Sequence, residues 1–368
     1  MSSNRYSSLP PVLLRTLPDN DTFPGRRNVH LLRHFHKVTS LSLGSSLVQE
    51  AMHSNVAQTA WSQAYLMHIV LAVASVDFKC HTSSTNQARQ YLTLAVMGAR
   101  HWQTGRELYR GIFATSEGIR QQRGDVVIGI TFLAAIYTFA LGEPIEPDAY
   151  FVAYDEAVSH AISPMAAASG IPAMRYSLRL FDNSSAWKAV IEDSDDGQGT
   201  FTSEDQGIAG LPPAFVDLCG LDSASTAQNN RYHVILRHLG PLLRSKPTDE
   251  HFVKCIAFGA RTFLEFRLLL EQKDPKALLL ISYWFALLGQ LDQWWSRARV
   301  KSECLAITDY LSTVPDTRIH ALLFYPASFG QATTSWLWLS LATRISIRIN
   351  HSNAGQEHKR CVPVCCCE

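Results

Sequence analysis

The sequence predicts an all-α fold, arranged either as a multi-helix bundle or as stacked helical layers. Apolar residues recur at intervals of three and four through much of the chain, which is the period of an amphipathic helix. No segment with the alternating period of a β-strand competes with these helices. With 368 residues, of which 46% are hydrophobic and 18% charged, the chain can bury a large core.

The N-terminal part is expected to be a linker followed by a short helix. Residues 1–27 carry four prolines and no sustained periodicity, which predicts a flexible linker. The first helix is expected over about residues 28–42. Its apolar stripe consists of Leu31, Leu32, Phe35 and Val38.

Two long helices are expected next. One begins near Gln58 and runs to about Phe78, with apolar residues on nearly every face, which predicts a helix that is buried all round. The other begins at Ser84, which has capping-box spacing to Gln87, and runs to Phe113. Large aromatic and small residues alternate along one of its faces, and this favours close helix packing. These residues are Tyr91, Ala95, Gly98, Trp102, Gly105, Tyr109 and Ile112.

Residues 126–140 form an apolar segment whose length is at the lower limit for crossing a bilayer. Its flanks lack the aromatic and basic anchors of membrane spans, and the adjoining helices are amphipathic. We therefore expect a central core helix, preceded by a cap at Gly124 and Asp125, and no membrane span.

The second half of the chain repeats the helical pattern between polar breaks. Residues 192–212 are acidic and rich in glycine, which predicts an exposed loop, and residues 223–230 form a second polar break. A helix is expected over about 251–271. Asp274 and Pro275 then form an N-cap with proline at the first helical position, and they introduce a helical run that reaches about residue 311.

The charge balance and the N-terminal residues restrict the partners and the location. Lys and Arg total 33 against 32 Asp and Glu, so no positive field draws the chain toward nucleic acid, and no direct nucleic-acid partner is predicted. The N-terminus has no apolar signal-peptide core. We therefore expect a nuclear or cytoplasmic protein.

The cysteines do not form a zinc cluster. Four are isolated and are expected to be buried reduced thiols: Cys80, Cys219, Cys255 and Cys304. The other four crowd the end of the chain: Cys361, Cys365, Cys366 and Cys367. A binuclear zinc cluster needs six thiolates in close pairs, which neither group provides.

Five of the expected helical segments occur in an order that is shared with a known family. They are 31–36 (LLRHFH), 61–76, 91–113, 126–140 and 281–295, the last ending in LDQWW. This ordered set resembles the C-terminal regulatory domain of fungal binuclear zinc-cluster transcription factors, in particular the sterol-uptake regulators. The zinc cluster itself and its basic linker are missing from the N-terminal side.

The resemblance implies an all-α regulatory domain over residues 28–314 that binds a sterol or a similar apolar metabolite between its helices and couples occupancy to transcription. It implies a nuclear protein acting as a homodimer or with a DNA-binding regulator. Residues 315–368 do not resemble the family's usual ending, and we expect a divergent segment there with a disordered, cysteine-rich tail.

A buried apolar pocket is also expected from the residues themselves, because large rigid aromatic side chains on packed helices leave gaps between them. Aromatic residues at helical spacing are more often plain core, so only positions in the middle of the helices that carry the resemblance are chosen as pocket walls. The predicted ligand-binding residues are Met67, Leu71, Phe132, Tyr137, Trp284 and Leu288.

The sequence supports an enzyme less well than a ligand-binding module. No catalytic residue, metal site or cofactor is predicted. Residues 193–196 spell DSDD, which matches the acid motif of class II terpene cyclases, but a hydrophilic loop would keep Asp195 ionised. His30 and His34 are one helical turn apart, yet no carboxylate near them in the sequence completes a metal site. His68 is expected to be hydrogen-bonded in the core. The alternative function is a metabolite-converting enzyme, such as an isomerase or cyclase, recruited onto this scaffold.

Overall fold

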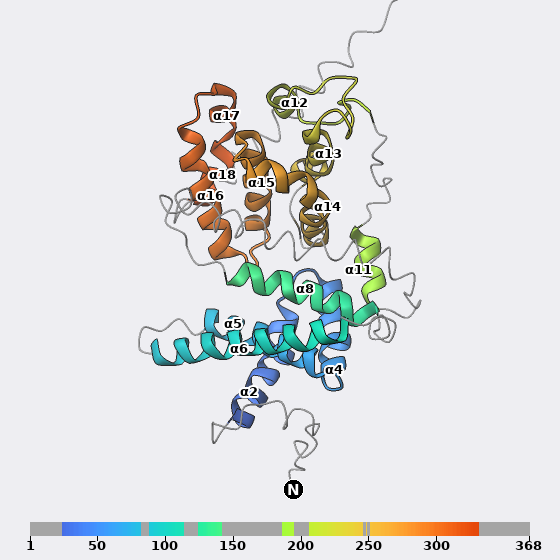
Figure 1. Ribbon diagram of the computed structural model, residues 1–368, viewed down its shortest axis with the longest axis vertical. Helices are drawn as coiled ribbons and strands as arrows, with labels where there is room; N and C mark the ends of the chain where they lie inside the picture. The colour runs from blue at the N-terminus through green and yellow to red at the C-terminus, as the bar shows by residue number, and fades with distance from the viewer. Residues whose placement is uncertain are drawn as a thin grey trace, which may run out of the picture.

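Helices provide the regular structure of the computed structural model, which describes residues 24–81, 88–113, 124–141, 186–194, 206–245, 248 and 251–330. No β-strand occurs among these residues. The all-α prediction is thus confirmed. The helices form two stacked groups, with one apolar helix lying between them (Figure 1). We call the group of helices α2 to α6, within residues 24–113, the N-terminal layer, and the group α12 to α18, within residues 213–330, the C-terminal layer.

The N-terminal layer begins with α2 (Pro24–Lys37) and a 3-10 turn, η1 (Thr39–Leu41), so the first helix ends earlier than the predicted residue 42. Next comes a helical stretch made of α3 (Ser46–Glu50), the π-helical η2 (Ala51–Val56) and α4 (Ala57–Ala60). The chain then turns before α5 (Ala64–His81). The helix predicted from Gln58 to Phe78 is therefore interrupted, and Trp61, in this turn, is exposed rather than buried.

The close helix packing predicted for the second of the long helices is confirmed, and its partner is the helix before it. α6 (Ala88–Phe113) lies against α5 and is seen lengthwise in Figure 1. A Cβ atom added at Gly98 would lie 3.2 Å from Ser75 Cβ, and one added at Gly105 would lie 3.1 Å from the backbone O of Tyr65. The two glycines therefore let the helix backbones approach each other. The capping-box residues before α6 lie outside the described residues.

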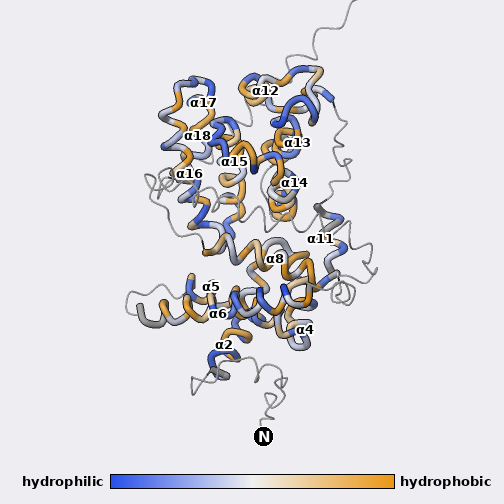
Figure 2. Tube along the Cα trace, viewed as in Figure 1, coloured by the Kyte–Doolittle hydropathy of each residue, from blue (hydrophilic) through white to orange (hydrophobic). Residues whose placement is uncertain are grey.

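The helix between the layers is α8 (Gly124–Ala140), and it is buried along almost its whole length, as predicted for a core helix. Figure 2 shows it as a mainly hydrophobic segment. Among the described residues, no helix combines the length and the apolar character that a bilayer span requires. The short α11 (Ala186–Ser194) follows, so Glu192 to Ser194, which were predicted to begin a loop, are helical. Residues 206–212 contain no helix.

The C-terminal layer opens with three helices: α12 (Pro213–Cys219), α13 (Arg231–Arg244) and α14 (Phe252–Glu271). The polar break predicted at 223–230 is present, and the side chain of Asn230 caps α13. α15 (Pro275–Gln290) begins as predicted, because the Asp274 side chain accepts a hydrogen bond from the Ala277 amide at 2.8 Å.

The helical run predicted to reach residue 311 is divided in two. α15 ends at Gln290 and α16 (Arg297–Ser312) begins after a turn over residues 291–296, in which Asp292 has φ 49°. Aspartate tolerates this left-handed conformation better than most side chains. The turn redirects the chain so that α16 packs beside α15.

Helical packing continues past residue 314. α17 (Thr317–Leu322) and α18 (Phe324–Gly330) lie against α15 and α16. The Tyr283 hydroxyl donates to the backbone O of Leu322 at 2.8 Å, and the Gln290 amide donates to the Tyr325 hydroxyl at 2.6 Å. Residues 315–330 are therefore part of the C-terminal layer.

Candidate functional site

The interlayer helix α8 meets the C-terminal layer at a set of aromatic and aliphatic side chains that we call the aromatic seam. On the side of α8, Phe139 lies with its ring centroid 6.0 Å from Trp284 and 5.1 Å from Trp295. At the other end of the seam, the Phe132 ring lies 5.9 Å from Phe252. The seam consists of Phe132, Ala135, Ile136, Phe139, Phe252, Ile256, Trp284 and Trp295.

Helical periodicity explains how α8 contributes to the seam. Phe132, Ile136 and Phe139 stand four and three residues apart, so they share one face of the helix. Trp284 comes from the middle of α15, and Trp295 comes from the turn that follows it. The seam therefore joins α8 to residues of α15 and its following turn, which lie far along the chain from α8.

A small void lies inside the seam, with a volume of about 10 Å³. Its lining is Phe132, Ala135, Ile136, Phe139, Ile256, Trp284 and Trp295. Such a volume admits about one water molecule, whereas sites for drug-sized ligands measure about 300–1,000 Å³. The void is too small for a sterol, and a ligand of that size requires α8 to separate from α14 and α15 at the seam.

The structure brings two of the six predicted wall residues to this void, namely Phe132 and Trp284. The other four are buried but do not line it: Met67, Leu71, Tyr137 and Leu288. Tyr137 instead stacks on Trp102 of α6, with 4.4 Å between the ring centroids. Sequence reasoning missed Phe139 and Trp295, although the spacing from Phe132 to Phe139 already placed Phe139 on the same helix face.

The tryptophan N–H groups near the seam differ in their partners. Trp284 Nε1 donates to the backbone O of Cys255 at 2.7 Å, and Trp294 Nε1 donates to Ser42 Oγ at 3.1 Å. Trp295 is 2% exposed, and its Nε1 has no hydrogen-bond partner among the described residues. The seam thus contains one buried donor that the described part of the protein does not satisfy.

A buried charged pair lies beside the seam. Arg299 and Glu303 of α16 are both almost fully buried, with 3.8 Å between Arg299 Nη1 and Glu303 Oε1. The guanidinium carbon of Arg299 also lies 5.9 Å from the centroid of the Phe139 ring. Cations within about 6 Å of an aromatic face are attracted to it. Arg299 therefore helps to fix Phe139, which forms one wall of the void.

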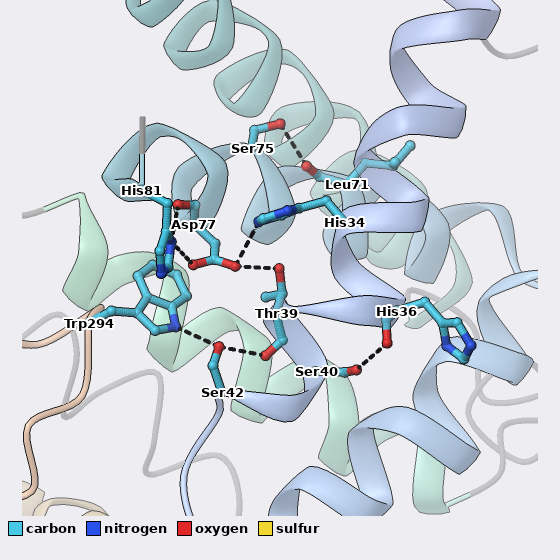
Figure 3. A network of polar contacts seen from close by, with 10 residues as sticks. All are labelled: His34, His36, Thr39, Ser40, Ser42, Leu71, Ser75, Asp77, His81 and Trp294. Atoms are coloured by element: carbon cyan, nitrogen blue, oxygen red, sulfur yellow. Dashed lines mark hydrogen bonds and ion pairs between the residues drawn. The ribbon is translucent and has the colours of Figure 1, made fainter. Parts of the chain in front are cut away.

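A polar network next to the seam is centred on the fully buried carboxylate of Asp77 in α5 (Figure 3). Its Oδ2 accepts hydrogen bonds from His34 Nε2 at 3.0 Å and from Thr39 Oγ1 at 2.5 Å. His81 Nδ1 lies 2.9 Å from Oδ1 and also 2.9 Å from the backbone O of Asp77. The network therefore joins α2, η1 and α5.

The same region connects the two layers. The Ser42 hydroxyl donates to the backbone O of Thr39 at 2.9 Å and accepts from Trp294 Nε1, as Figure 3 shows. Close by, the Gly44 amide donates to Gln293 Oε1 at 2.9 Å. We call the Ser42 and Gly44 bonds the cross-layer contacts. They attach the N-terminal layer to the same 291–296 turn that carries Trp295.

The histidines that the sequence singled out have structural partners. His30 packs edge-on against Phe78, with 5.3 Å between the ring centroids. No carboxylate lies near His34 in the sequence. In the structure, His34 bonds to the carboxylate of Asp77, which lies 43 residues further along the chain. Among the described residues, no group of three or more His, Cys, Asp or Glu side chains could hold a metal ion. The prediction that His68 is hydrogen-bonded in the core is confirmed by its contact with His101, 2.9 Å between the Nδ1 atoms.

The isolated cysteines are mostly core residues. Cys219, Cys255 and Cys304 are buried, and burial raises the pKa of the Cys255 thiol to about 12, so it stays protonated. The prediction was wrong for Cys80, which is exposed near the end of α5. In the DSDD segment, Asp193 and Ser194 end α11, whereas Asp195 and Asp196 lie outside the described residues.

Comparison of the chain with protein-family models and with curated proteins of known function found no match.

Proposed function

We propose that this chain is a transcription-regulator-like module that binds an apolar metabolite at the aromatic seam. The observation that carries the proposal is the void of about 10 Å³ at the junction of α8, α14 and α15, which is lined by apolar and aromatic side chains. Ligand sites are usually concave, mostly apolar and located between structural units. The resemblance of the helical segments to sterol-uptake regulators supports a sterol, or a terpenoid or polyketide-like molecule, as the ligand.

Ligand binding would change the position of the two layers relative to each other. A ligand larger than the void must separate α8 from α14 and α15, and pockets of this kind are minor states that a ligand stabilises. The cross-layer contacts at Ser42 and Gly44 end on the turn that carries Trp295. A ligand that displaces Trp295 would therefore also change these contacts, and with them the relation between the layers.

The proposed module regulates a lipid or secondary-metabolite pathway in the nucleus. It would act as a homodimer or through a DNA-binding regulator. The near balance of 33 basic and 32 acidic residues supports an indirect role at DNA. The alternative, a metabolite-converting enzyme, is tested by the same experiment.

The test is purification of the protein from a native extract, followed by solvent extraction and identification of bound small molecules by mass spectrometry. The variant Ala135→Leu fills the void, because Ala135 lines it. The control variant Ala134→Leu makes the same change at the neighbouring position of α8, which does not line the void. We expect an apolar molecule with wild type and with the control, and much less of it with Ala135→Leu.

Three outcomes would change the conclusion. Absence of a co-purifying molecule at meaningful occupancy contradicts the proposal. Equal occupancy in both variants places binding away from the seam. Conversion of the recovered molecule on incubation with fresh protein, with loss of turnover in Asp195→Asn, favours the enzyme alternative.

A further inference from the structure

We infer that the ligand of the seam carries a hydrogen-bond acceptor oxygen, such as that of a ketone, and that the indole N–H of Trp295 donates a hydrogen bond to this oxygen. This inference rests on the proposed function, and it adds the chemical class of the ligand. The rest of the ligand is apolar and uncharged.

The indole of Trp295 carries a buried hydrogen-bond donor. Buried polar groups in proteins are nearly always hydrogen-bonded, so each exception calls for a partner. Trp295 is 2% exposed, and its Nε1 has no acceptor in the described part of the chain. Its neighbours show that acceptors are available where the packing requires them, because Trp284 donates to Cys255 and Trp294 to Ser42. Trp284 also lines the void, but only Trp295 of these two tryptophans leaves its N–H without an acceptor in the described part of the chain.

A water molecule is a poor candidate for the missing partner. The void has room for about one water, but buried waters usually make about three hydrogen bonds. Apart from two tryptophans, the residues lining the void have hydrocarbon side chains, and the indole N–H of Trp284 is already engaged. A water would therefore find a single donor and no second partner, whereas a ketone oxygen attached to an apolar body needs no more than one.

The lining also fixes the charge of the ligand. Five of the lining residues have hydrocarbon side chains without a polar group, so an ionised ligand group placed there would lose its hydration without compensation. They are Phe132, Ala135, Ile136, Phe139 and Ile256. The guanidinium of Arg299, behind Phe139, is paired with Glu303. A neutral acceptor that faces Trp295 can accept its indole N–H, and the other side chains that line the void then make only apolar contacts with the ligand.

The experiment compares two probes of almost equal shape. 1-Indanone and indane share a bicyclic hydrocarbon frame, and only the first has an acceptor oxygen. Their dissociation constants are measured by ligand-observed NMR titration with wild type, Trp295→Phe and Trp102→Phe. The control Trp102→Phe makes the same exchange on α6, where Trp102 stacks on Tyr137 away from the void.

We expect wild type and Trp102→Phe to bind 1-indanone about 3- to 10-fold more tightly than indane, which is the usual contribution of one hydrogen bond. Trp295→Phe should bind the two probes equally. Equal binding by wild type, or a full preference retained in Trp295→Phe, overturns the inference and leaves the proposed function standing. Failure of both probes to bind wild type up to their solubility limits contradicts the proposed function as well.

A second measurement needs no variant. In ¹⁵N-labelled wild-type protein, the indole N–H resonance of Trp295 should move downfield on addition of 1-indanone and not on addition of indane. The resonances of the other indoles serve as internal references. If the Trp295 resonance responds equally to the two probes, the hydrogen bond does not form.

Discussion

His68 Nδ1 lies 2.9 Å from His101 Nδ1 in a buried contact between α5 and α6, so one of these two nitrogens must donate and the other accept. The second nitrogen of His101, Nε2, lies 3.1 Å from Asn28 Oδ1, which can only accept. His101 therefore carries its proton on Nε2, and His68 donates from Nδ1. Both rings are neutral in this arrangement, and a proton added to His101 would break the bond.

This pair makes the stability of the protein sensitive to acid. Burial lowers the pKa of His68 from 6.5 to about 4, and burial together with the neighbouring His68 lowers the pKa of His101 to about 3. The unfolded chain therefore binds more protons than the folded chain below pH 6.5. The stabilisation is complete above that pH. It is lost as the pH falls toward 4 for His68 and toward 3 for His101, by up to about 1.4 kcal/mol per pH unit for each histidine.

The variant His101→Gln tests this dependence, because glutamine keeps a donor and an acceptor but does not titrate. We expect the free energy of unfolding of wild type to fall more steeply between pH 6 and pH 5 than that of the variant, by about 1 kcal/mol. Urea unfolding at the two pH values measures the difference. Identical slopes would show that His101 is protonated in the folded protein.

A second prediction uses two glycines of α6. A Cβ atom at Gly105 would lie 2.9 Å from Ile69 Cγ1 and 3.1 Å from the backbone O of Tyr65, whereas one at Gly111 meets nothing within 4 Å. Gly105→Ala should destabilise the protein by about 1–2 kcal/mol, because overpacking exceeds the gain in helix propensity. Gly111→Ala should stabilise it by about 0.5–1 kcal/mol. Thermal unfolding of both variants gives the comparison, and a shift of the same sign in both would contradict the close packing.

The sequence predicted the helices well because their signals are local. The apolar faces of α5 and α8 and the cap at Asp274 all depend on residues within a few positions of each other. The aromatic and small residues along α6 likewise predicted that it packs closely on another helix, which the structure shows to be α5. The division of the run after Gln290 was missed because it depends on Trp295 being buried against α8, which is a tertiary contact.

The candidate site was predicted only in part, for the same reason. Phe132 and Trp284 were chosen because they stand in the middle of apolar helices, and the structure places both on the void. Met67 and Tyr137 met the same criterion but face other parts of the core. Asp77 was not singled out at all. Its role comes from His34 and Thr39, which lie 43 and 38 residues away in the sequence.

The third prediction concerns this buried carboxylate. Asp77→Ala removes the acceptor shared by His34 and Thr39 and should lower the free energy of unfolding by about 3 kcal/mol. Ser75→Ala is the matched control, since Ser75 is equally buried in α5 but its hydroxyl donates to the backbone O of Leu71, within the same helix. It should cost less than about 1 kcal/mol. Urea unfolding near pH 7 measures both, and similar costs would mean that the network adds no stability.

The last prediction tests whether the cross-layer contacts control opening of the seam. Gln293→Ala removes the acceptor of the Gly44 amide and frees the turn that carries Trp295 from one attachment to the N-terminal layer. Gln290→Ala is the matched control, because Gln290 is also half-buried and loses a side-chain bond to Tyr325, but within the C-terminal layer. Each change should cost about 1 kcal/mol of stability.

The two variants should differ in the dynamics of the seam. Hydrogen exchange at the Gly44 amide should accelerate in Gln293→Ala and remain unchanged in Gln290→Ala, because only the first breaks a contact between the layers. If ligands enter where the layers separate, 1-indanone should also associate faster with Gln293→Ala, since less free energy is needed to reach the open state. Equal association rates in the two variants would place the entry route elsewhere, even if the Gly44 amide exchanges faster.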